Sequence, residues 1–492
     1  MKKLVIISIL ISSVFLRGLS QNVDDALRYS QNFYSGTARF VSMGGAFTAL
    51  GGDLSAIMLN PASTGVFRSF EFSVTPQMMY NNYSSKWNNS SASDFKYTMN
   101  FAQAGGVYTI IPPKGESGLV GLNFAYSYNR TNNFNENITI KGIGDNSSLA
   151  DAWVNDANGT YYKDLRGAAG IAFDAWLIDT LANKGGAQYA SIFSNFGENT
   201  NSTYGQTVKR VIQNEGYSGI NTFSLGANIS NKLFLGFSFN YSKLSYTGHY
   251  QHIESDDNNK VFDLSNFTYT DHFEATGSGY SFDLGAIYRP VEFLRIGGAV
   301  HTPVVYRISE YFYDNVTSNF DNFDKYEFAN DPLRYKYTLT TPFKVNGGVA
   351  FQIKKFALLS ADYEYLDYRL AQFSKASDDY DYSVENQDIK NILKAASNLR
   401  VGAEFRIKSI YLRGGYNRYG KVFASGELNN DLVYNGFSGG IGFRQQKFYF
   451  DLAYSALFSK NNYMMYFDPG YLKPASISNN KSGFTATIGF KF

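Results

Sequence analysis

A short serine motif is the pattern in this chain that comes closest to an enzyme signature. Gly436-Phe437-Ser438-Gly439-Gly440 matches G-x-S-x-G, in which a nucleophilic serine sits on a sharp turn between a strand and a helix. Here the motif lies within a predicted strand over residues 434–444, and no helical pattern follows it. Without that turn the serine is not presented to a substrate. We therefore expect no catalytic residues and no enzyme activity.

The four histidines are the next candidates, because imidazole binds metal ions and haem iron. They are His249, His252, His272 and His301. His249 and His252 are three residues apart, so on a strand they face opposite sides and meet only if the strand has ended. Haem capture by this pair is one alternative. A place in a loop or at an interface accounts for both residues without any ligand.

The acidic residues and the cysteine count give little metal chemistry. Asp256-Asp257 and Asp378-Asp379 offer carboxylates for divalent cations, but neither pair follows the spacing of an EF-hand loop. Solvated acidic loops are the simpler interpretation. The chain has no cysteine, which excludes disulfides and thiolate metal sites. We expect neither a metal site nor another cofactor.

The elements that carry these residues follow a two-residue period. At the C-terminus Phe484, Ala486, Ile488, Phe490 and Phe492 alternate with polar or small residues, so a strand there has one apolar face. Aromatic residues make up 17% of the chain, and 45 glycines accompany them. A barrel in a bilayer needs such strands, with lipid outside and polar groups inside. A soluble β-sandwich or propeller is the alternative.

The N-terminus favours the barrel because it predicts export. Lys2 and Lys3 precede an apolar run over 4–16, and Gly18-Leu19-Ser20 follows as a cleavage site, so residues 1–20 are predicted to be a signal peptide. An exported chain with two-faced strands indicates the bacterial outer membrane. The remaining chain is close to neutral, which gives no reason to expect nucleic acid as a partner.

Segments with strand periodicity recur from residue 69 to the end. We predict an all-β, antiparallel transmembrane barrel of about fourteen strands over 69–492. The predicted strands are 69–81, 95–111, 119–131, 217–229, 233–250, 267–289, 294–311, 334–353, 356–373, 398–407, 409–419, 434–444, 447–458 and 482–492. Their connections alternate between short turns and long polar loops. The longest is 132–216, where 165–182 is predicted to be helical, and 389–396 is a weaker helical prediction.

Residues 21–68 do not follow the strand pattern and are predicted to form a plug, or hatch, inside the barrel. The segment is small, apolar and rich in glycine, whereas linkers are usually polar. Asp53 and Ser55 are predicted to cap a short helix through 57–58. Pro61 is predicted to end that helix.

Prolines and glycine pairs interrupt several predicted strands. Pro76, Pro303 and Pro342 each remove a backbone donor and are candidate kinks in the barrel wall. Glycine pairs stand at 105–106, 297–298, 347–348, 414–415 and 439–440. Such pairs allow bulges or close contact with the hatch, and they also fit simple curvature of the barrel.

The hatch segment resembles the FadL–TodX family of outer-membrane transporters for hydrophobic compounds. The resemblance rests on Met43-Gly44-Gly45-Ala46, Asp53-Leu54-Ser55-Ala56 and Asn60-Pro61-Ala62. The family usually has glycine directly after Asn-Pro-Ala, whereas here Ser63 follows and Gly65 comes two residues later. Residues 399–406 and 412–416 are similar to a late hairpin of the same family. These motifs cover about a tenth of the chain.

The resemblance implies a plugged fourteen-stranded barrel that transports long-chain fatty acids or aromatic hydrocarbons. It implies that the ligand leaves by a shift of the hatch or through a gap in the wall. The residues expected to shape the hatch or its gating are Gly44, Gly45, Asp53, Asn60, Pro61, Ala62 and Gly65. The pocket residues are not assigned, because a slip of one residue in register exchanges the two strand faces.

Several partners and rival functions accompany this interpretation. Expected partners are the hydrophobic ligand, outer-membrane lipid, lipopolysaccharide, and the barrel-assembly machinery through the strand ending in Phe492. A monomer is expected because a closed barrel leaves no free edge. The rivals are a PorV-like secretion shuttle that docks proteins, a haem receptor and a passive porin.

Overall fold

The chain forms one closed antiparallel barrel of fourteen strand courses, as the sequence predicts. The computed structural model describes residues 22–112, 118–182, 184–197, 203–261, 263–468 and 472–492. The barrel closes where β1 pairs with β21, from Glu71↔Lys491 to Lys86↔Ser476. The predicted signal peptide, 1–20, lies outside the described residues. Within those residues no helix is long and apolar enough to cross a bilayer.

Fourteen courses are built from eighteen strands, because four courses are made of two strands each. These composite courses are β3–β4, β10–β11, β13–β14 and β15–β16. The strands are β1 (Glu71–Trp87), β2 (Ser90–Ile110), β3 (Leu119–Asn133), β4 (Glu136–Ile143), β7 (Thr207–Ile229), β8 (Leu233–Ser255), β9 (Leu264–Val291), β10 (Leu294–His301), β11 (Val305–Phe320), β13 (Leu333–Thr340), β14 (Lys344–Ile353), β15 (Ala357–Asp367), β16 (Gln372–Ser374), β17 (Ala395–Ile407), β18 (Ile410–Tyr419), β19 (Tyr434–Arg444), β20 (Phe448–Tyr463) and β21 (Ala475–Lys491). A further strand, β12 (Lys325–Ala329), pairs only with the far end of β11.

Many strands run well past their predicted ends, so several predicted loops were too long. The clearest case is 82–94, predicted as a loop, where β1 and β2 meet in a tight turn at Asn88 and Asn89. The segment is rich in Asn and Ser, which hides the strand in the sequence. Neighbouring backbones nevertheless satisfy each other's hydrogen bonds along the whole hairpin, so the ladder continues. The same correction applies to 251–266, 312–333 and 459–481.

The two faces of the strands follow the predicted alternation. On β8, Leu235 and Phe237 are exposed on the outside, whereas Ser238 and Asn240 are fully buried inside. Phe234, which breaks the alternation, is only 2% exposed and packs under the hatch beside Ala62. An inward apolar residue is therefore favoured where the lumen is filled with protein.

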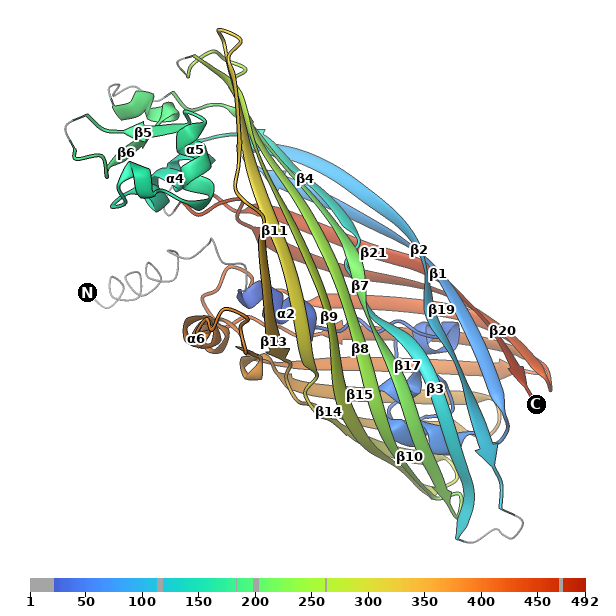
Figure 1. The fold of residues 1–492 in the computed structure, drawn as a ribbon. Helices are drawn as coiled ribbons and strands as arrows, with labels where there is room; N and C mark the ends of the chain where they lie inside the picture. The colour runs from blue at the N-terminus through green and yellow to red at the C-terminus, as the bar shows by residue number, and fades with distance from the viewer. Residues whose placement is uncertain (1–21, 113–117, 183, 198–202, 262, 469–471) are drawn as a thin grey trace.

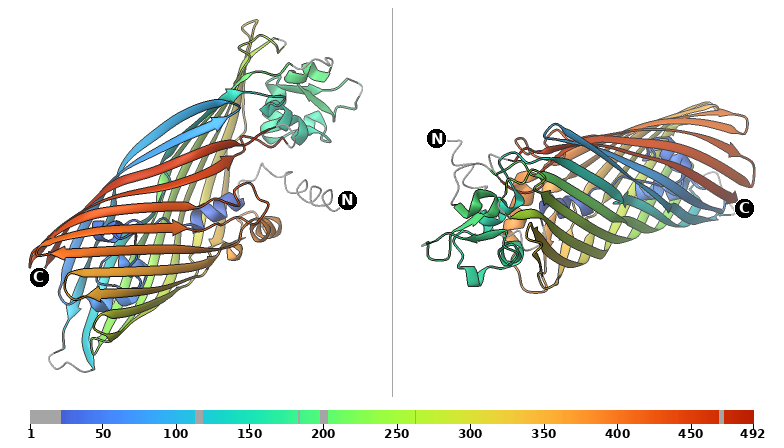
Figure 2. Two further views of the ribbon diagram at one scale, coloured as in Figure 1. Left: turned by 180° about the vertical axis from the view of Figure 1, so that it is seen from behind. Right: turned by 90° about the horizontal axis from the view of Figure 1, so that it is seen from above.

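The longest loop folds into a small cap at the end of the barrel opposite the C-terminus (Figures 1 and 2). It contains α4 (Leu149–Ala157), α5 (Gly167–Asp174), and the hairpin of β5 (Ile178–Thr180) and β6 (Tyr189–Ser191). Residues 165–182, predicted to form one or two short helices that cap the barrel mouth, contain the helix α5, which ends at Asp174, and β5 then follows. α4 was missed; its only sequence signal was the capping box of Ser148 and Asp151.

The cap and the barrel mouth each have an apolar core. Trp153 and Phe193 of the cap pack against Phe267 of β9. At the mouth, α2 (Val23–Ser30) packs with α6 (Ser383–Ile392), as Figure 1 shows. The helix predicted over 389–396 therefore begins and ends earlier than expected, because β17 takes over at Ala395.

Candidate functional site

The N-terminal segment folds inside the barrel, where it crosses the lumen as three short helical turns. These are α3 (Ala38–Ser42), η1 (Ala56–Met58) and η2 (Pro61–Val66), the blue elements inside the barrel in Figure 1. Most residues between 36 and 67 are buried. Their apolar side chains pack mainly on one another, in a cluster that includes Phe40, Phe47 and Leu59. We call residues 36–67 the hatch.

Asn60 joins two parts of the hatch to the barrel wall. Its Oδ1 accepts a hydrogen bond from Ala62 N (3.0 Å), and its Nδ2 donates to Thr48 O (2.7 Å) and to Ala286 O of β9 (3.2 Å). Asn60 is thus the N-cap of η2, and Pro61 occupies the first position of that turn. The prediction that Pro61 ends a helix was wrong; it begins one.

Asp53 and Ser55 also act differently from the prediction. Asp53 accepts hydrogen bonds from Thr37 Oγ1 and Ser55 N, each at 2.9 Å. Ser55 makes no side-chain cap to η1, and its Oγ instead accepts from Thr37 N (2.8 Å). Both side chains therefore fasten α3 to η1 across the hatch.

A belt of inward-facing glycines lines the wall where it meets the hatch. A Cβ at Gly236 would lie 2.1 Å from Pro61 C, one at Gly285 2.0 Å from Asn60 Oδ1, and one at Gly415 2.1 Å from Gly44 N. No side chain fits at these distances. The other members of the glycine belt are Gly226, Gly297, Gly348, Gly402 and Gly440.

The belt explains the glycine pairs in the sequence. In the pairs at 297–298, 347–348, 414–415 and 439–440, one glycine meets the hatch or its wall contacts and the other faces the opposite side with open space or a single distant contact. Adjacent members also face each other across strands, as Gly236 pairs with both Gly226 and Gly285. Gly65 of the hatch also lies close to the wall: a Cβ added there would be 2.7 Å from Ala227 O.

Two further hatch glycines form the sharp bend after α3. Gly44 and Gly45 have φ values of +63° and +76°, which L-residues with side chains rarely adopt. The bend brings the backbone of Gly44 against Tyr416 of β18. The predicted packing of this turn against the wall is therefore seen in the structure.

A buried network of charges ties α3 to the wall. Arg39 Nε bonds Glu404 Oε2 (3.0 Å), which also accepts from Arg413 Nε (2.7 Å); Arg413 Nη1 then bonds Asp451 Oδ1 (2.6 Å). Glu404, Arg413 and Asp451 are fully shielded from solvent. Removal of one partner would leave an uncompensated buried charge, so the network fixes where α3 can lie.

The three prolines lie at irregularities of the wall. The register of β1 with β2 shifts between Thr75 and Pro76. Pro303 stands between β10 and β11, and Pro342 stands between β13 and β14. The two breaks are side by side, since Thr341 N donates to Val304 O (3.0 Å). The proposed role of these sites as kinks remains a prediction.

The wall is interrupted between β2 and the course of β3 and β4. β2 pairs with β3 only from Gln103↔Asn129 to Ile110↔Leu122, so Ser90–Ala102 has no strand partner on that side. The β3–β7 register shifts between Arg130 and Asn132, and β4 then continues along β7. We call this interruption the seam.

Side chains rather than a backbone ladder hold β4 against the inner faces of β1 and β2. Ser85 Oγ donates to Thr139 O (2.6 Å), and Thr139 Oγ1 donates to Asp94 Oδ2 (2.8 Å). Outside the seam β2 presents a row of exposed apolar side chains, of which Met99 is 82% exposed. The seam therefore lies between the lumen and an apolar outer edge, closed by side chains.

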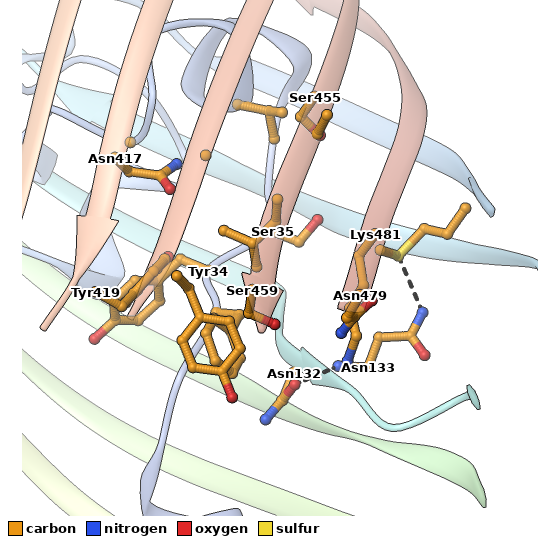
Figure 3. Close-up of a pocket in the computed structure, with 18 of the residues that line it drawn as sticks. Tyr34, Ser35, Asn132, Asn133, Asn417, Tyr419, Ser455, Ser459, Asn479 and Lys481 are labelled. Carbon is orange, nitrogen blue, oxygen red and sulfur yellow. Dashed lines mark hydrogen bonds between the residues drawn. The ribbon is translucent and has the colours of Figure 1, made fainter. Parts of the chain in front are cut away.

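A cavity of about 290 Å³ lies in the lumen above the hatch and reaches the seam (Figure 3). Its floor includes Phe40 and the Gly44–Gly45 bend, and its seam side includes Asn132, Asn133 and Ile138. Aromatic contacts shape one wall, where Phe33 meets Tyr419 and Tyr434 with ring centroids 4.9 and 4.7 Å apart. Most of its lining alternates between apolar rings and neutral polar groups.

Three cations, Arg130, Arg400 and Lys481, and the anion Glu136 also line this cavity, and Arg400 is deeply buried. Arg400 is 1% exposed, pairs with Glu364 (Nη2–Oε1, 3.0 Å) and stacks on Tyr34 with its guanidinium carbon 4.9 Å from the ring centre. Among the described residues, its Nε and Nη1 find no hydrogen-bond acceptor. Lys481 lies 3.7 Å from Glu136 (Nζ–Oε2), and both line the cavity. Unused donors at an apolar cavity suit a ligand with one polar or anionic end.

The residues first singled out for chemistry do not come together. His249 lies beside His272 with ring centroids 6.1 Å apart, whereas His252 faces the other way, buried, and is bonded to Glu254 (2.9 Å). In the described part of the chain no group of three or more His, Cys, Asp or Glu is placed to hold a metal. Ser438 lies within β19, and the next described element is another strand, β20.

The sequence did not reveal most residues that bind the hatch from the wall side. Asp362 Oδ2 accepts from Thr48 N (2.7 Å), and His301 Nε2 and Asn346 Nδ2 lie 3.2 and 3.0 Å from Leu59 O. The available signal was their position: polar or charged residues at inward places on otherwise apolar strands. Reading it requires the strand register, which the sequence leaves open.

Comparison with known proteins shows the fold. A crystal structure of a Pseudomonas aeruginosa FadL homologue matches with a TM-score of 0.56, 11% identity, and coverage of 94% of this chain and 100% of that chain. The P. putida toluene transporter TodX matches with a TM-score of 0.52, 10% identity and coverage of 94% and 99%. No family model and no curated protein matches the sequence. The prediction of a FadL–TodX-type barrel is thus confirmed at the level of the fold.

Proposed function

We propose that this chain is an outer-membrane transporter for hydrophobic small molecules and not an enzyme. The observation that carries the proposal is the course of the 290 Å³ cavity, which lies above a sealed hatch and opens toward the seam. An apolar ligand in this cavity has a short path to the lipid-facing edge of β2. The route leads sideways into the bilayer and avoids the packed hatch.

The structural neighbours support the same class of function. They are a FadL homologue and a toluene transporter, both with the barrel seen here. Desolvation of an apolar ligand in such a cavity contributes roughly 25 cal/mol per Å² of buried surface. A water-filled porin would give such ligands no similar preference, and here the hatch fills the lumen.

The cavity chemistry favours a long-chain fatty acid over a plain hydrocarbon. Arg400 and Lys481 supply cationic donors, while rings such as Phe33 and Tyr434 supply the apolar surface. A carboxylate would use donors of Arg400 that have no acceptor among the described residues. An aromatic hydrocarbon would leave them unused.

The test combines native mass spectrometry with a variant that fills the cavity. The purified barrel is expected to retain an apolar molecule that added palmitate displaces, and Ser459→Phe is expected to lower palmitate binding at least about tenfold, because the ring takes up cavity volume. Lys460→Phe is the control, since Lys460 is the exposed neighbour on the same strand. Equal palmitate binding by both variants would refute the cavity as the ligand site.

A secretion shuttle of the PorV-like type is the second candidate, favoured by the exposed aromatic surface of the cap. Trp176 is 51% exposed, and the exposed Tyr161 and Tyr162 of the same cap contact each other with ring centroids 4.6 Å apart. Exposed aromatic clusters are common at protein interfaces. Co-purification of one exported protein, lost in a Trp176→Ser variant while palmitate binding persists, would favour the shuttle.

The proposed location is the bacterial outer membrane, after removal of residues 1–20. The cap end of the barrel faces the cell exterior in this proposal, because short turns such as 230–232 gather at the other end. The exposed Phe492 closes the last strand next to Phe70, with ring centroids 5.4 Å apart. This end is the proposed contact for the barrel-assembly machinery, and the closed ladder supports a monomer.

A further inference from the structure

Four cations gather on the outer surface of the barrel, on strands that lie side by side (Figure 1). Lys243 is on β8, Arg307 on β11, Lys336 on β13, and Lys375 directly follows β16. All four are exposed, and together with Ser278 and Thr338 they line a groove of about 740 Å³. We call this surface the cationic groove.

Strand register places the four charges in one row. Ser278 of β9 pairs with Lys243 on one side and with Arg307 on the other. Arg307 pairs in turn with Thr338, and Ser309 pairs with Lys336. Thr338 pairs with Ser374, the residue before Lys375. The row therefore crosses five neighbouring strands at nearly matching register positions.

These cations are not engaged by acids of the protein. None of the four forms an ion pair with any residue that the structure describes. The next outward-facing acid along β9 is Glu274, which is bonded to His272 (2.9 Å). Asp378, three residues after Lys375, accepts from Tyr380 N (3.4 Å). Four like charges held close together repel one another unless an anion lies between them.

The position of the groove along β8, relative to the membrane-spanning stretch, indicates which kind of anion it meets. From its start at the short-turn end, β8 runs nine residues, 233–241, with the alternate residues Leu233, Leu235, Phe237, Phe239 and Tyr241 on one face, which matches the ~9–11 residues that cross a bilayer. The groove begins at the next outward position, Lys243, whose Nζ lies 5.8 Å from the centre of the Tyr241 ring. Tyr241 also contacts Tyr280 (5.3 Å). Such tyrosines mark the membrane–water interface, where lipid headgroups begin.

We propose that the cationic groove binds the phosphate-bearing headgroup of a lipid in the outer leaflet. The lipid's phosphates would lie among Lys243, Arg307 and Lys336, where the serine and threonine hydroxyls of the groove add neutral donors. Its acyl chains would run down over Phe239 and Tyr280, whose rings are 5.8 Å apart. The inference rests on the proposed outer-membrane placement but not on the transported ligand. It assigns a fixed lipid partner to one side of the barrel.

The test is a titration of the purified full-length protein in neutral detergent, followed by native mass spectrometry. The probe is bisphosphorylated lipid A, compared with the same lipid after enzymatic removal of its phosphates. Each single change, Lys243→Gln or Arg307→Gln, is expected to weaken lipid binding about fivefold, from roughly 1 kcal/mol per cation at an anionic surface. The combined change of all four residues to Gln is expected to weaken it at least about a hundredfold, since the effects of separate cations largely add.

Matched controls make the outcome decisive. Arg418→Gln with Lys460→Gln removes two exposed cations from β18 and β20 and should leave lipid binding unchanged. Palmitate binding, measured in parallel, should survive in every groove variant, so failure here is distinguishable from failure of the proposed function. Equal binding of the dephosphorylated lipid, or an equal loss in the control variant, would overturn the proposal. Displacement of the lipid by millimolar inorganic phosphate would instead assign the groove to a free anion and overturn it as well.

Discussion

The two sides of the barrel solve the problem of enclosing a hatch in opposite ways. From β7 to β19 neighbouring strands pair with one another, apart from the short breaks at Pro303 and Pro342, and glycines bring the backbone against the hatch. Between β2 and β4 the ladder stops, and hydrogen bonds such as Thr139 Oγ1 to Asp94 Oδ2 take its place. The cavity lies between the two sides, with Arg400 and Tyr434 on the first and Asn132 and Ile138 on the second.

The difference shows which contacts keep the barrel closed and which can separate. Backbone pairing is cooperative and leaves no group unsatisfied, so the glycine side can open only by breaking many hydrogen bonds together. Isolated side-chain hydrogen bonds contribute only about 1 kcal/mol each. The seam can therefore part locally while the glycine side holds the hatch in place.

The largest effect is expected when a side chain is added to the glycine side of the wall. Gly236→Val is expected to destabilise the folded barrel by about 3 kcal/mol or more, because its Cβ would meet the Pro61 backbone, which cannot rotate away. Uptake of palmitate should be lost as well. The heat-induced shift of the folded band on a gel measures the stability.

Gly414→Val is the matched control on β18, since nothing lies within 4 Å of a Cβ there. This variant should fold and transport like the original protein. If Gly236→Val were equally well tolerated, the glycine belt would not be the contact that seals the hatch.

Locking the seam should have the next largest effect on uptake. Asp94→Cys with Thr139→Cys places two thiols where the original side-chain oxygens are 2.8 Å apart. The chain has no other cysteine, so oxidation can form only this bond. We expect uptake to fall at least about tenfold on oxidation and to recover on reduction, because the seam can no longer part.

The same lock on the glycine side should have no effect. Thr222→Cys with Asn240→Cys joins β7 to β8, where Thr222 Oγ1 and Asn240 Oδ1 are 2.9 Å apart. Those strands are already in full register. Loss of uptake in both oxidised variants would contradict a lateral route through the seam.

Weakening the hatch itself should reduce uptake without unfolding the barrel. Asn60→Ala removes the cap of η2 and leaves the buried Thr48 carbonyl without its donor, a local cost of about 2 kcal/mol. Pro61→Ala should have a smaller effect in the same direction. Palmitate uptake by cells and the gel shift of the folded barrel measure the two consequences separately.

A gating role for Asn60-Pro61-Ala62 requires that uptake falls while the barrel stays folded. Unchanged uptake in the Asn60→Ala variant would exclude the role. An unfolded barrel would show that Asn60 serves assembly instead. Ser63→Ala is a suitable control, because its hydroxyl makes only a 3.4 Å hydrogen bond within the hatch.

The smallest effect is expected in the cap, which belongs to neither side of the comparison. Burial raises the pKa of Asp151 from 3.8 to about 6, although Ser191, Tyr204 and the backbone of Ser148 donate hydrogen bonds to the carboxylate. The folded cap therefore holds this proton more tightly than the unfolded cap. Its stability should rise by about 1 kcal/mol as the pH falls from 7 to 5 and should be lost again as the pH rises.

Hydrogen exchange of residues 149–193 at the two pH values measures this effect. Asp151→Asn should abolish the pH dependence and leave palmitate uptake unchanged. The exposed Asp164 provides the control, since Asp164→Asn should keep the pH dependence of the original cap. An equal pH response in the Asp151→Asn variant would show that another group, such as the nearby Glu254, is responsible.

The sequence predicted the barrel well because lipid imposes a strict period. The alternation on β8 and β21 and the short turns such as Lys354-Lys355 were enough for the strand count and for the fold. The same period did not predict the strands beyond the membrane, where β1 and β2 continue through Asn- and Ser-rich stretches. There no solvent boundary requires one apolar face, and pairing alone keeps the strands.

The site was harder to predict because its residues are polar and far apart in the chain. Arg400 and Tyr34 stand more than 300 residues apart yet stack at the cavity. The motif Asn60-Pro61-Ala62 marked the hatch, but no local pattern indicated that Asn60 would bond Ala286 of the wall. The seam was also hidden, since β3 and β4 read as a strand followed by a loop.

The sequence by itself determined the strands, their two faces, the closed barrel and the existence of a separate N-terminal segment, because each depends on residue types at local spacing. The tertiary structure alone decided which inward glycines touch the hatch, where the ladder breaks, and which cations share a surface. These depend on register between strands, where a shift of one residue exchanges the faces. Local composition is unchanged by such a shift, so only the folded barrel settles it.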